Sequence, residues 1–135
     1  MIKNLVINKL DIRSDERGWL AEILRKENLN GKKDFGQIFI TVAKPGVTKG
    51  NHYHKRKEEW FCVIRGRGKL LLKENSSGQY QEVSMGEDNM VAVKIPPNVV
   101  HAIQNIGDEM LYLLIYIDEP FNRQDPDTFP GKPNP

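Results

Sequence analysis

The sequence predicts an all-β protein, because strand signals recur along its whole length. Short stretches of alternating apolar and polar residues return at intervals of roughly ten residues. Clusters of Gly, Pro, Asn, Ser and Asp separate these stretches, and no window supports a helix longer than about two turns. Many short strands at this spacing are typical of an antiparallel β-sandwich or barrel, the class that includes jelly rolls.

Each expected strand is bounded by residues that favour turns. The turn signals are Pro45-Gly46, Gly66-Arg67-Gly68, Asn75-Ser76-Ser77-Gly78, Gly86-Glu87-Asp88, Pro96-Pro97-Asn98 and Gly107-Asp108. The strands are therefore expected at Leu5–Lys9, Trp19–Leu24, Gln37–Ala43, Lys49–His54, Glu59–Arg65, Lys69–Glu74, Gln79–Ser84, Met90–Ile95, His101–Asn105 and Met110–Ile117.

Two segments break this rhythm. Arg25–Phe35 is rich in Asn, Gly and Lys, so we expect a mobile loop that covers one mouth of a barrel. Glu119–Pro135 carries five prolines and reads as an extended tail, draped over its own domain or over a neighbouring subunit. A length of 135 residues predicts one domain, 1–135, of which residues 119–135 form the tail.

Composition excludes several classes of function. A net charge of +2 without a dominant basic block argues against nucleic-acid binding. Of the two short basic runs, Lys32-Lys33 is interpreted as part of a solubilising loop, and Lys55-Arg56-Lys57 is a candidate for a functional role. No apolar run is long enough to span a membrane and no signal peptide is present, so we expect a cytoplasmic protein. The single Cys62 lies in an apolar segment and fits a reducing compartment.

All three histidines of the chain fall in two short windows. His52 and His54 are one residue apart, so on a strand both side chains point the same way. Glu59 on the next strand and His101 on a later one would complete a site of three nitrogens and one oxygen. Such a ligand set accepts zinc, iron, manganese or nickel, and we expect a bound divalent metal, with zinc preferred.

These windows resemble the two sequence motifs of the cupin superfamily. Gly50, His52, His54, Glu59 and Gly66 match the first motif. The second corresponds to Gly86, Pro96-Pro97-Asn98, His101 and Asn105, with Asn98 where the family usually has glycine. Asn tolerates the left-handed turn required there. The resemblance implies a cupin-type antiparallel jelly roll, a fold that hosts many activities.

A narrower resemblance comes from the flanking segments. Asp15–Glu22 is similar to the opening segment of dTDP-4-dehydrorhamnose 3,5-epimerases, and Lys49–His54 resembles the histidine loop of those enzymes and of sugar-nucleotide 3,4-ketoisomerases. Pro45–Thr48, the histidine box and Asp125–Thr128 look like the C-terminal cupin domain of bifunctional capsular-polysaccharide enzymes. In that family the cupin binds zinc and epimerises a UDP-linked 4-keto-6-deoxy amino sugar, and a separate reductase acts afterwards.

The resemblance implies a sugar-nucleotide epimerase or ketoisomerase of surface-polysaccharide biosynthesis. A proton is removed beside the ketone of a nucleoside-diphosphate 4-keto-6-deoxy sugar, through an enediolate that the metal stabilises. If all three histidines bind metal, the base is a tyrosine, a lysine or a metal-bound hydroxide. The resemblance to the 3,5-epimerases implies a second mechanism, in which His52 is the base and no metal is needed. The catalytic candidates are therefore His52, Lys49, Tyr112 and Tyr116.

Substrate-binding candidates lie in the same flanking segments. Arg17 and Lys49 are candidates to bind the diphosphate. Trp19 would either stack on the nucleotide base or be buried in the core or in a dimer interface. Glu22 and Asn51 complete the set. The resemblance also implies a homodimer in which Asp15–Glu22 reaches a neighbour's site. Two alternatives stay open, a metal-dependent dioxygenase and a non-enzymatic cupin that binds a sugar or another small molecule.

Overall fold

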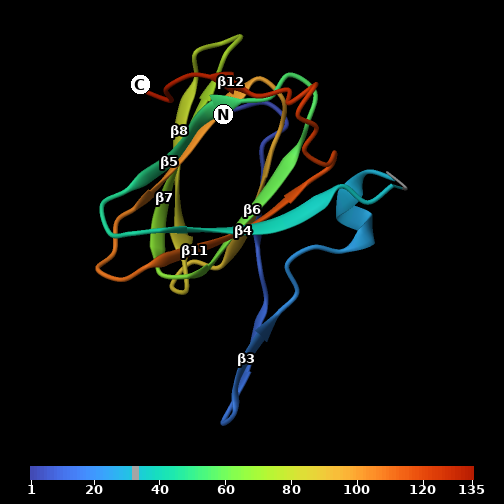
Figure 1. Ribbon diagram of the computed structural model, residues 1–135. Coiled ribbons are helices and arrows are strands. Elements are labelled where there is room, and N and C mark those ends of the chain that lie inside the picture. Colours follow the sequence, from blue (N-terminus) through green and yellow to red (C-terminus); the bar gives the residue numbers. More distant parts are fainter. Residues whose placement is uncertain (32–33) are drawn as a thin grey trace.

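Two five-stranded antiparallel sheets pack face to face, and a two-stranded hairpin extends away from them (Figure 1). The computed structural model describes residues 1–31 and 34–135. One sheet has the order β1-β9-β6-β11-β4 and the other the order β12-β5-β10-β7-β8. The strands are β1 Val6–Lys9, β2 Ile12–Asp15, β3 Gly18–Ala21, β4 Gln37–Ala43, β5 Thr48–Tyr53, β6 Glu59–Arg65, β7 Arg67–Glu74, β8 Tyr80–Gly86, β9 Val91–Ile95, β10 Val99–Asn105, β11 Leu111–Ile117 and β12 Phe129–Pro130.

The chain crosses from one sheet to the other between β4 and β5, β5 and β6, and β6 and β7. Side chains that point between the sheets form one apolar core. Along β7, Leu70 and Leu72 are fully buried while the residues between them are partly exposed, as strand alternation requires. The all-β prediction is confirmed, and the observed connectivity is that of an antiparallel jelly roll.

The N-terminal hairpin differs from the expectation of a single strand at Trp19–Leu24. Its strands are β2 and β3, which pair only with each other. The backbone N–H of Arg17 donates to Asp15 Oδ1 at 2.8 Å, and Gly18 has φ of 140°. This Asx-type turn reverses the chain between the two strands. Ile23 and Leu24 leave the hairpin and pack on the outer face of the first sheet.

The segment after the hairpin was expected to be a loop over a barrel mouth. It contains a 3₁₀ helix, η1 (Lys26–Leu29), and Leu29 packs with Trp60 and Tyr116 on the outer face of the first sheet. The segment therefore covers a sheet face and not a barrel mouth, because apolar side chains recur in it. Lys32-Lys33, the expected solubilising pair, lies outside the described residues.

The C-terminal tail lies along the edge of the second sheet. Phe129 and Pro130 form β12, which pairs with Tyr53 and His52 of β5. In Figure 1 the red tail crosses one end of the barrel, far from the hairpin. Within the described ranges, the single 3₁₀ turn is the only helical element, and no helix there is long or apolar enough to cross a membrane.

Candidate metal centre

A β-bulge at Gly50-Asn51 points His52 into the barrel. The pairing of β5 with β10 slips at this point, so that His52 lies opposite His101 and Gly50 lies opposite Ala102. Gly50 has φ of 109° and Asn51 has φ of 58°, both in the left-handed region where Gly and Asn are tolerated best. The rings of His52 and His101 meet edge to face, with centroids 4.8 Å apart. The extra residue is therefore part of how the site is built.

His54 follows β5 and is fixed from both sides. Its Nδ1 lies 2.7 Å from the main-chain carbonyl oxygen of Asp127, and its Nε2 lies 2.8 Å from Glu59 Oε1. A carbonyl oxygen only accepts, so Nδ1 must carry the proton. In neutral His54 the lone pair therefore resides on Nε2, the nitrogen that faces Glu59.

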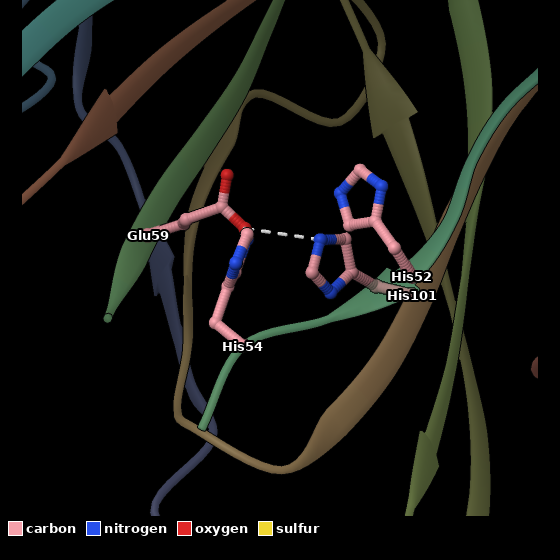
Figure 2. A group of neighbouring side chains, drawn as sticks. All are labelled: His52, His54, Glu59 and His101. Carbon is pink, nitrogen blue, oxygen red and sulfur yellow. Dashed lines mark hydrogen bonds and ion pairs between the residues drawn. The ribbon is translucent and has the colours of Figure 1, made fainter. Parts of the chain in front are cut away.

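His101, on the neighbouring strand β10 of the same sheet, is oriented in the same way. Its Nδ1 donates to the carbonyl oxygen of Val99 at 3.0 Å, and its Nε2 lies 3.0 Å from Glu59 Oε1. Figure 2 shows both imidazoles turned toward the same carboxylate. A backbone partner on Nδ1 that leaves Nε2 for the metal is the usual arrangement around histidine ligands.

Burial and mutual charge set the protonation of this cluster. Burial raises the pKa of Glu59, but the attraction of His101 and the hydrogen bond with His54 outweigh it and hold that pKa well below its usual range. Burial is the largest single influence on His54 and lowers its pKa, but the hydrogen bond to Glu59, the charge of Glu59 and the contact with Asp127 together outweigh it, so the pKa is raised. Burial, helped by repulsion from His101, lowers the pKa of His52 to about 4. Near neutral pH His52 is therefore an uncharged imidazole with a lone pair available to a metal, and Glu59 is an ionised carboxylate.

The four side chains fit a divalent cation. Their ligand atoms all lie within 4.8 Å of one another, and His54, Glu59 and His101 are buried. His101 Nε2 is buried without a hydrogen-bond partner, although Glu59 Oε1 is close enough to attract a positive charge. Lone pairs that converge on one point repel each other unless a proton or a cation lies between them. Three imidazole nitrogens and one carboxylate oxygen suit zinc, iron, manganese or nickel.

A pocket of about 170 Å³ opens over this cluster. Its walls are mainly apolar side chains from both sheets, and Lys49 supplies the charged part of the rim. Lys49 Nζ donates to Thr41 Oγ1 at 2.8 Å and to the Val42 carbonyl oxygen at 3.0 Å. The lining residues are Phe39, Thr41, Lys49, Gly50, His52, Glu59, Phe61, His101, Ile103, Leu113 and Ile115. An apolar cavity with a few convergent polar groups is typical of a small-molecule site.

Tyr112 and Tyr116 lie on the other face of β11 from this pocket. Leu113 and Ile115 line the pocket, so the alternation of the strand turns both tyrosines outward. Tyr116 is buried against Trp60, and its hydroxyl accepts the N–H of Gly36 at 2.9 Å. The structure does not bring either tyrosine to the cluster, and we leave both out of the proposed chemistry.

The residues expected to bind substrate are divided between two places. Asn51 forms the bulge beside the cluster, and its carbonyl oxygen accepts the N–H of Gly131. Arg17, Trp19 and Glu22 belong to the hairpin region and do not line the pocket of their own chain. Arg17 pairs with Asp15 at 2.5 Å, Trp19 is half exposed, and Glu22 accepts from Arg25 at 3.2 Å.

Sequence reasoning missed two groups of residues at the site. Phe39, Thr41 and Phe61 form pocket walls, yet nothing in the sequence separates them from ordinary strand residues. Asp127 entered the sequence analysis only as part of Asp125–Thr128, a segment that resembles the capsular-polysaccharide enzymes, although its carbonyl oxygen orients His54. The signal that could have found it is the polar run Asp125–Thr128 inside a proline-rich tail.

Together, the jelly roll and the convergent histidines define a cupin. A dTDP sugar isomerase from Desulfovibrio desulfuricans has a similar structure, with a TM-score of 0.86 and 21% identity, covering 98% of this chain and 87% of that one. At this identity the likeness shows the fold alone. The expected cupin fold is confirmed.

The family follows from the sequence itself. Residues 13–129 match the model of the polysaccharide biosynthesis C-terminal domain, and the chain belongs to this family. It is 31% identical over 132 residues to the spore coat polysaccharide biosynthesis protein SpsL of Bacillus subtilis, covering 94% of this chain and 87% of that protein. It is also 32% identical over 118 residues to a UDP-2-acetamido-2,6-beta-L-arabino-hexul-4-ose reductase of Pseudomonas aeruginosa. That match covers 87% of this chain and only 30% of the reductase's length.

Proposed function

We propose that the protein is a sugar-nucleotide epimerase or ketoisomerase of surface-polysaccharide biosynthesis. It acts beside the ketone of a nucleoside-diphosphate 4-keto-6-deoxy sugar. The observation that carries the proposal is the cluster of His52, His54, Glu59 and His101 at the base of an apolar pocket whose rim holds Lys49. Membership of a polysaccharide-biosynthesis family supports the same class of substrate.

His52, His54, Glu59 and His101 would hold the divalent metal, with zinc the first choice for this ligand set. When bound, the ion supplies a Lewis acid that withdraws charge from a ketone oxygen. The apolar walls exclude water, which strengthens every electrostatic interaction in the pocket. Phe61 contributes to this by packing edge to face against the His101 ring at 5.5 Å.

The base must be a group that can reach a carbon held in the pocket. Among the lining residues in the described part of the chain, Lys49 is the only titratable side chain outside the cluster. It is held by Thr41 and Val42 and is therefore a candidate proton carrier or diphosphate contact. His52 is the least buried member of the cluster, and it would serve as the base only in a site without metal, because a ring nitrogen that binds a metal has no lone pair left for a proton.

The substrate class is supported by the relatives. The reductase of P. aeruginosa is named for a UDP-linked acetamido sugar with a ketone, and this chain matches one part of it. We therefore place a UDP-linked 4-keto-6-deoxy amino sugar first among the substrates, and propose that a separate reductase acts on the product. Nucleotide-sugar chemistry and a single buried thiol fit the reducing cytoplasm.

The exposed apolar side chains on β3 and β4 support a homodimer. β4 is an edge strand whose Ile38 and Ile40 are 54% and 50% exposed, and Trp19 and Leu20 of β3 are 50% and 55% exposed. An unpaired edge with apolar residues invites pairing with another chain. The hairpin points away from its own barrel, so Arg17 and Trp19 would serve the pocket of a second copy.

Proton exchange tests the proposal. A panel of UDP- and dTDP-linked 4-keto-6-deoxy sugars is incubated with the enzyme in heavy water, and deuterium beside the ketone is measured by mass spectrometry. The wild type should exchange at least one member of the panel, and His52→Ala should exchange none. Binding without exchange across the panel would favour a non-enzymatic sugar-binding cupin, and oxygen consumption would favour a dioxygenase.

A further inference from the structure

A segment of the C-terminal tail runs along the strand and loop that carry His52 and His54. We call residues 125–131 the strap. Within the strap, Pro130 pairs with His52 and Phe129 with Tyr53. The N–H of Gly131 donates to the carbonyl oxygen of Asn51 at 3.0 Å. The strap therefore contacts the histidine box along its length, although His54 and Asp127 are 73 positions apart in the sequence.

The Asp127 carboxylate anchors the strap. Its two oxygens accept the backbone N–H groups of Lys55, Arg56 and Lys57, each at 3.0 Å. Asp127 is 5% exposed and adopts φ of 47°, a left-handed conformation that is uncommon for residues other than glycine. Three charge-assisted hydrogen bonds from successive amides fix both the loop after His54 and the position of Asp127 itself.

The same residue reaches the metal centre through its main chain. The Asp127 carbonyl oxygen accepts a hydrogen bond from the Nδ1–H of His54 at 2.7 Å, and Thr128 Oγ1 lies 3.4 Å from that nitrogen. Displacement of Asp127 would free the imidazole to rotate or to change tautomer. Nε2 would then no longer be held in line with Glu59.

Aromatic contacts support the strap on its outer side. Phe129 stacks on Tyr53 with ring centroids 5.5 Å apart, and Lys55 Nζ lies 4.3 Å above the Phe129 ring. These contacts hold the strap next to the histidine box independently of the carboxylate. The tail therefore has two separate attachments, the carboxylate of Asp127 and the ring of Phe129.

We propose that Asp127 is a positioning residue of the metal centre: its carboxylate holds the strap so that its carbonyl oxygen fixes the tautomer and direction of His54. The inference rests on the proposed metal-binding function. The strap would be part of the second coordination shell, which orients a metal ligand without binding the ion. Metal affinity would therefore depend on Asp127, a residue that does not contact the metal.

Asp127→Asn and Asp125→Asn in the full chain test this role. Both substitutions remove one negative charge from the strap, but the Asp125 side chain pairs with Arg56 at 3.1 Å on the surface and does not touch the histidine box. Zinc affinity is measured by competition with a chromophoric chelator, and the coordination geometry by the visible spectrum after loading with Co²⁺. Asp127→Asn should raise the zinc dissociation constant roughly 10- to 100-fold and alter the cobalt spectrum, and Asp125→Asn should do neither.

Equal zinc affinity and equal spectra in the two variants would overturn the positioning role while leaving the metal centre in place. A wild type that binds no divalent metal would overturn the metal centre and this inference together, which distinguishes the two failures. If Asp127→Asn does not fold, the tautomer of His54 is read in the metal-free wild type, at a pH where the ring is neutral, from the ¹⁵N chemical shifts of its ring. A proton on Nδ1 is expected, and a proton on Nε2 alone would overturn the role.

Discussion

At the scale of single residues, the site depends on a few backbone conformations that only certain residues tolerate. Gly50 lies where β5 approaches β10 closely. A Cβ atom there would lie 2.9 Å from the carbonyl oxygen of His101 and 3.2 Å from Ala102 Cα. Both contacts are with backbone atoms, which cannot rotate away. The bulge that directs His52 inward therefore requires glycine.

Gly50→Ala should destabilise the protein and weaken metal binding. Gly46→Ala is a matched control, since Gly46 also has a left-handed φ, of 80°, but a Cβ there would have open space. The control should cost about 1–2 kcal/mol of unfolding free energy, the penalty for a left-handed non-glycine residue. Gly50→Ala should cost at least about 1 kcal/mol more because β10 must also shift. Urea denaturation of both variants measures the difference, and equal losses would show that the close approach is unimportant.

Cys62 provides a prediction about pH. Its thiol is buried and lies 3.8 Å from Met90 Sδ, and burial raises its pKa to about 11. Only the thiolate reacts with alkylating agents. Iodoacetamide should therefore leave the folded protein unmodified at pH 8 and modify it once urea unfolds it, as mass spectrometry would show. Rapid alkylation of the native protein would mean that β6 and β9 separate easily. The same assay reports whether each variant described above is folded.

At the scale of elements, the hairpin and the edge strand β4 expose large apolar side chains in the single chain. Ile40 lies on the outer face of β4 and is 50% exposed, so a charge there should not disturb the core. Ile40→Lys should convert the dimer to a monomer at micromolar concentration, as measured by light scattering. Val47→Lys, at a turn residue of 38% exposure, should leave the dimer intact. A monomeric and fully active wild type would contradict the dimer.

Arg17→Ala tests the assignment of the hairpin tip to the nucleotide. The Arg17 side chain is 84% exposed and pairs with the nearby Asp15 in the same turn, so its loss should not affect folding. A lost diphosphate contact should cost about 1.5–3 kcal/mol, which is roughly a tenfold to hundredfold rise in Kd for a sugar nucleotide and for the bare nucleoside diphosphate alike.

Arg67→Ala, another exposed arginine on the opposite sheet, is the control and should leave this affinity unchanged. His52→Ala should likewise leave diphosphate affinity nearly unchanged while abolishing exchange. Calorimetric titration measures all three variants. Unfolding of Arg17→Ala would make Arg17 a structural partner of Asp15 and remove the main support for the nucleotide assignment.

At the scale of the whole molecule, most of the fold could be predicted and part of the site could not. Strand alternation and turn residues located β4 to β11 to within a few residues, since each strand buries one face in a common core. β1 was predicted as well, β3 was expected as part of a longer strand at Trp19–Leu24, and β2, and with it the hairpin, and β12 were missed. The hairpin buries little apolar surface, and β12 consists of two residues, one of them a proline. Neither carries the alternation on which the prediction depended.

The ligand set was visible in the sequence for a different reason. His52, His54 and Glu59 are close in sequence, and strand alternation predicts that the two histidines point the same way, toward Glu59 on the next strand, which belongs to the other sheet. The position of Tyr112 and Tyr116 depends on which face of β11 turns inward, and the apolar residues Leu111, Leu113 and Ile115 decide this. Asp127 approaches His54 only in the folded chain, so no local pattern could have assigned its role.

The metal dependence of proton exchange tests the central claim most directly. Enzyme stripped with a chelator, and then reloaded with one zinc per chain, is incubated in heavy water with the best substrate of the panel. Deuterium beside the ketone is measured by mass spectrometry, and metal content by elemental analysis. We predict that exchange is lost on removal of the metal and returns on reloading. Full exchange in metal-free protein would contradict the claim and make His52 a simple base.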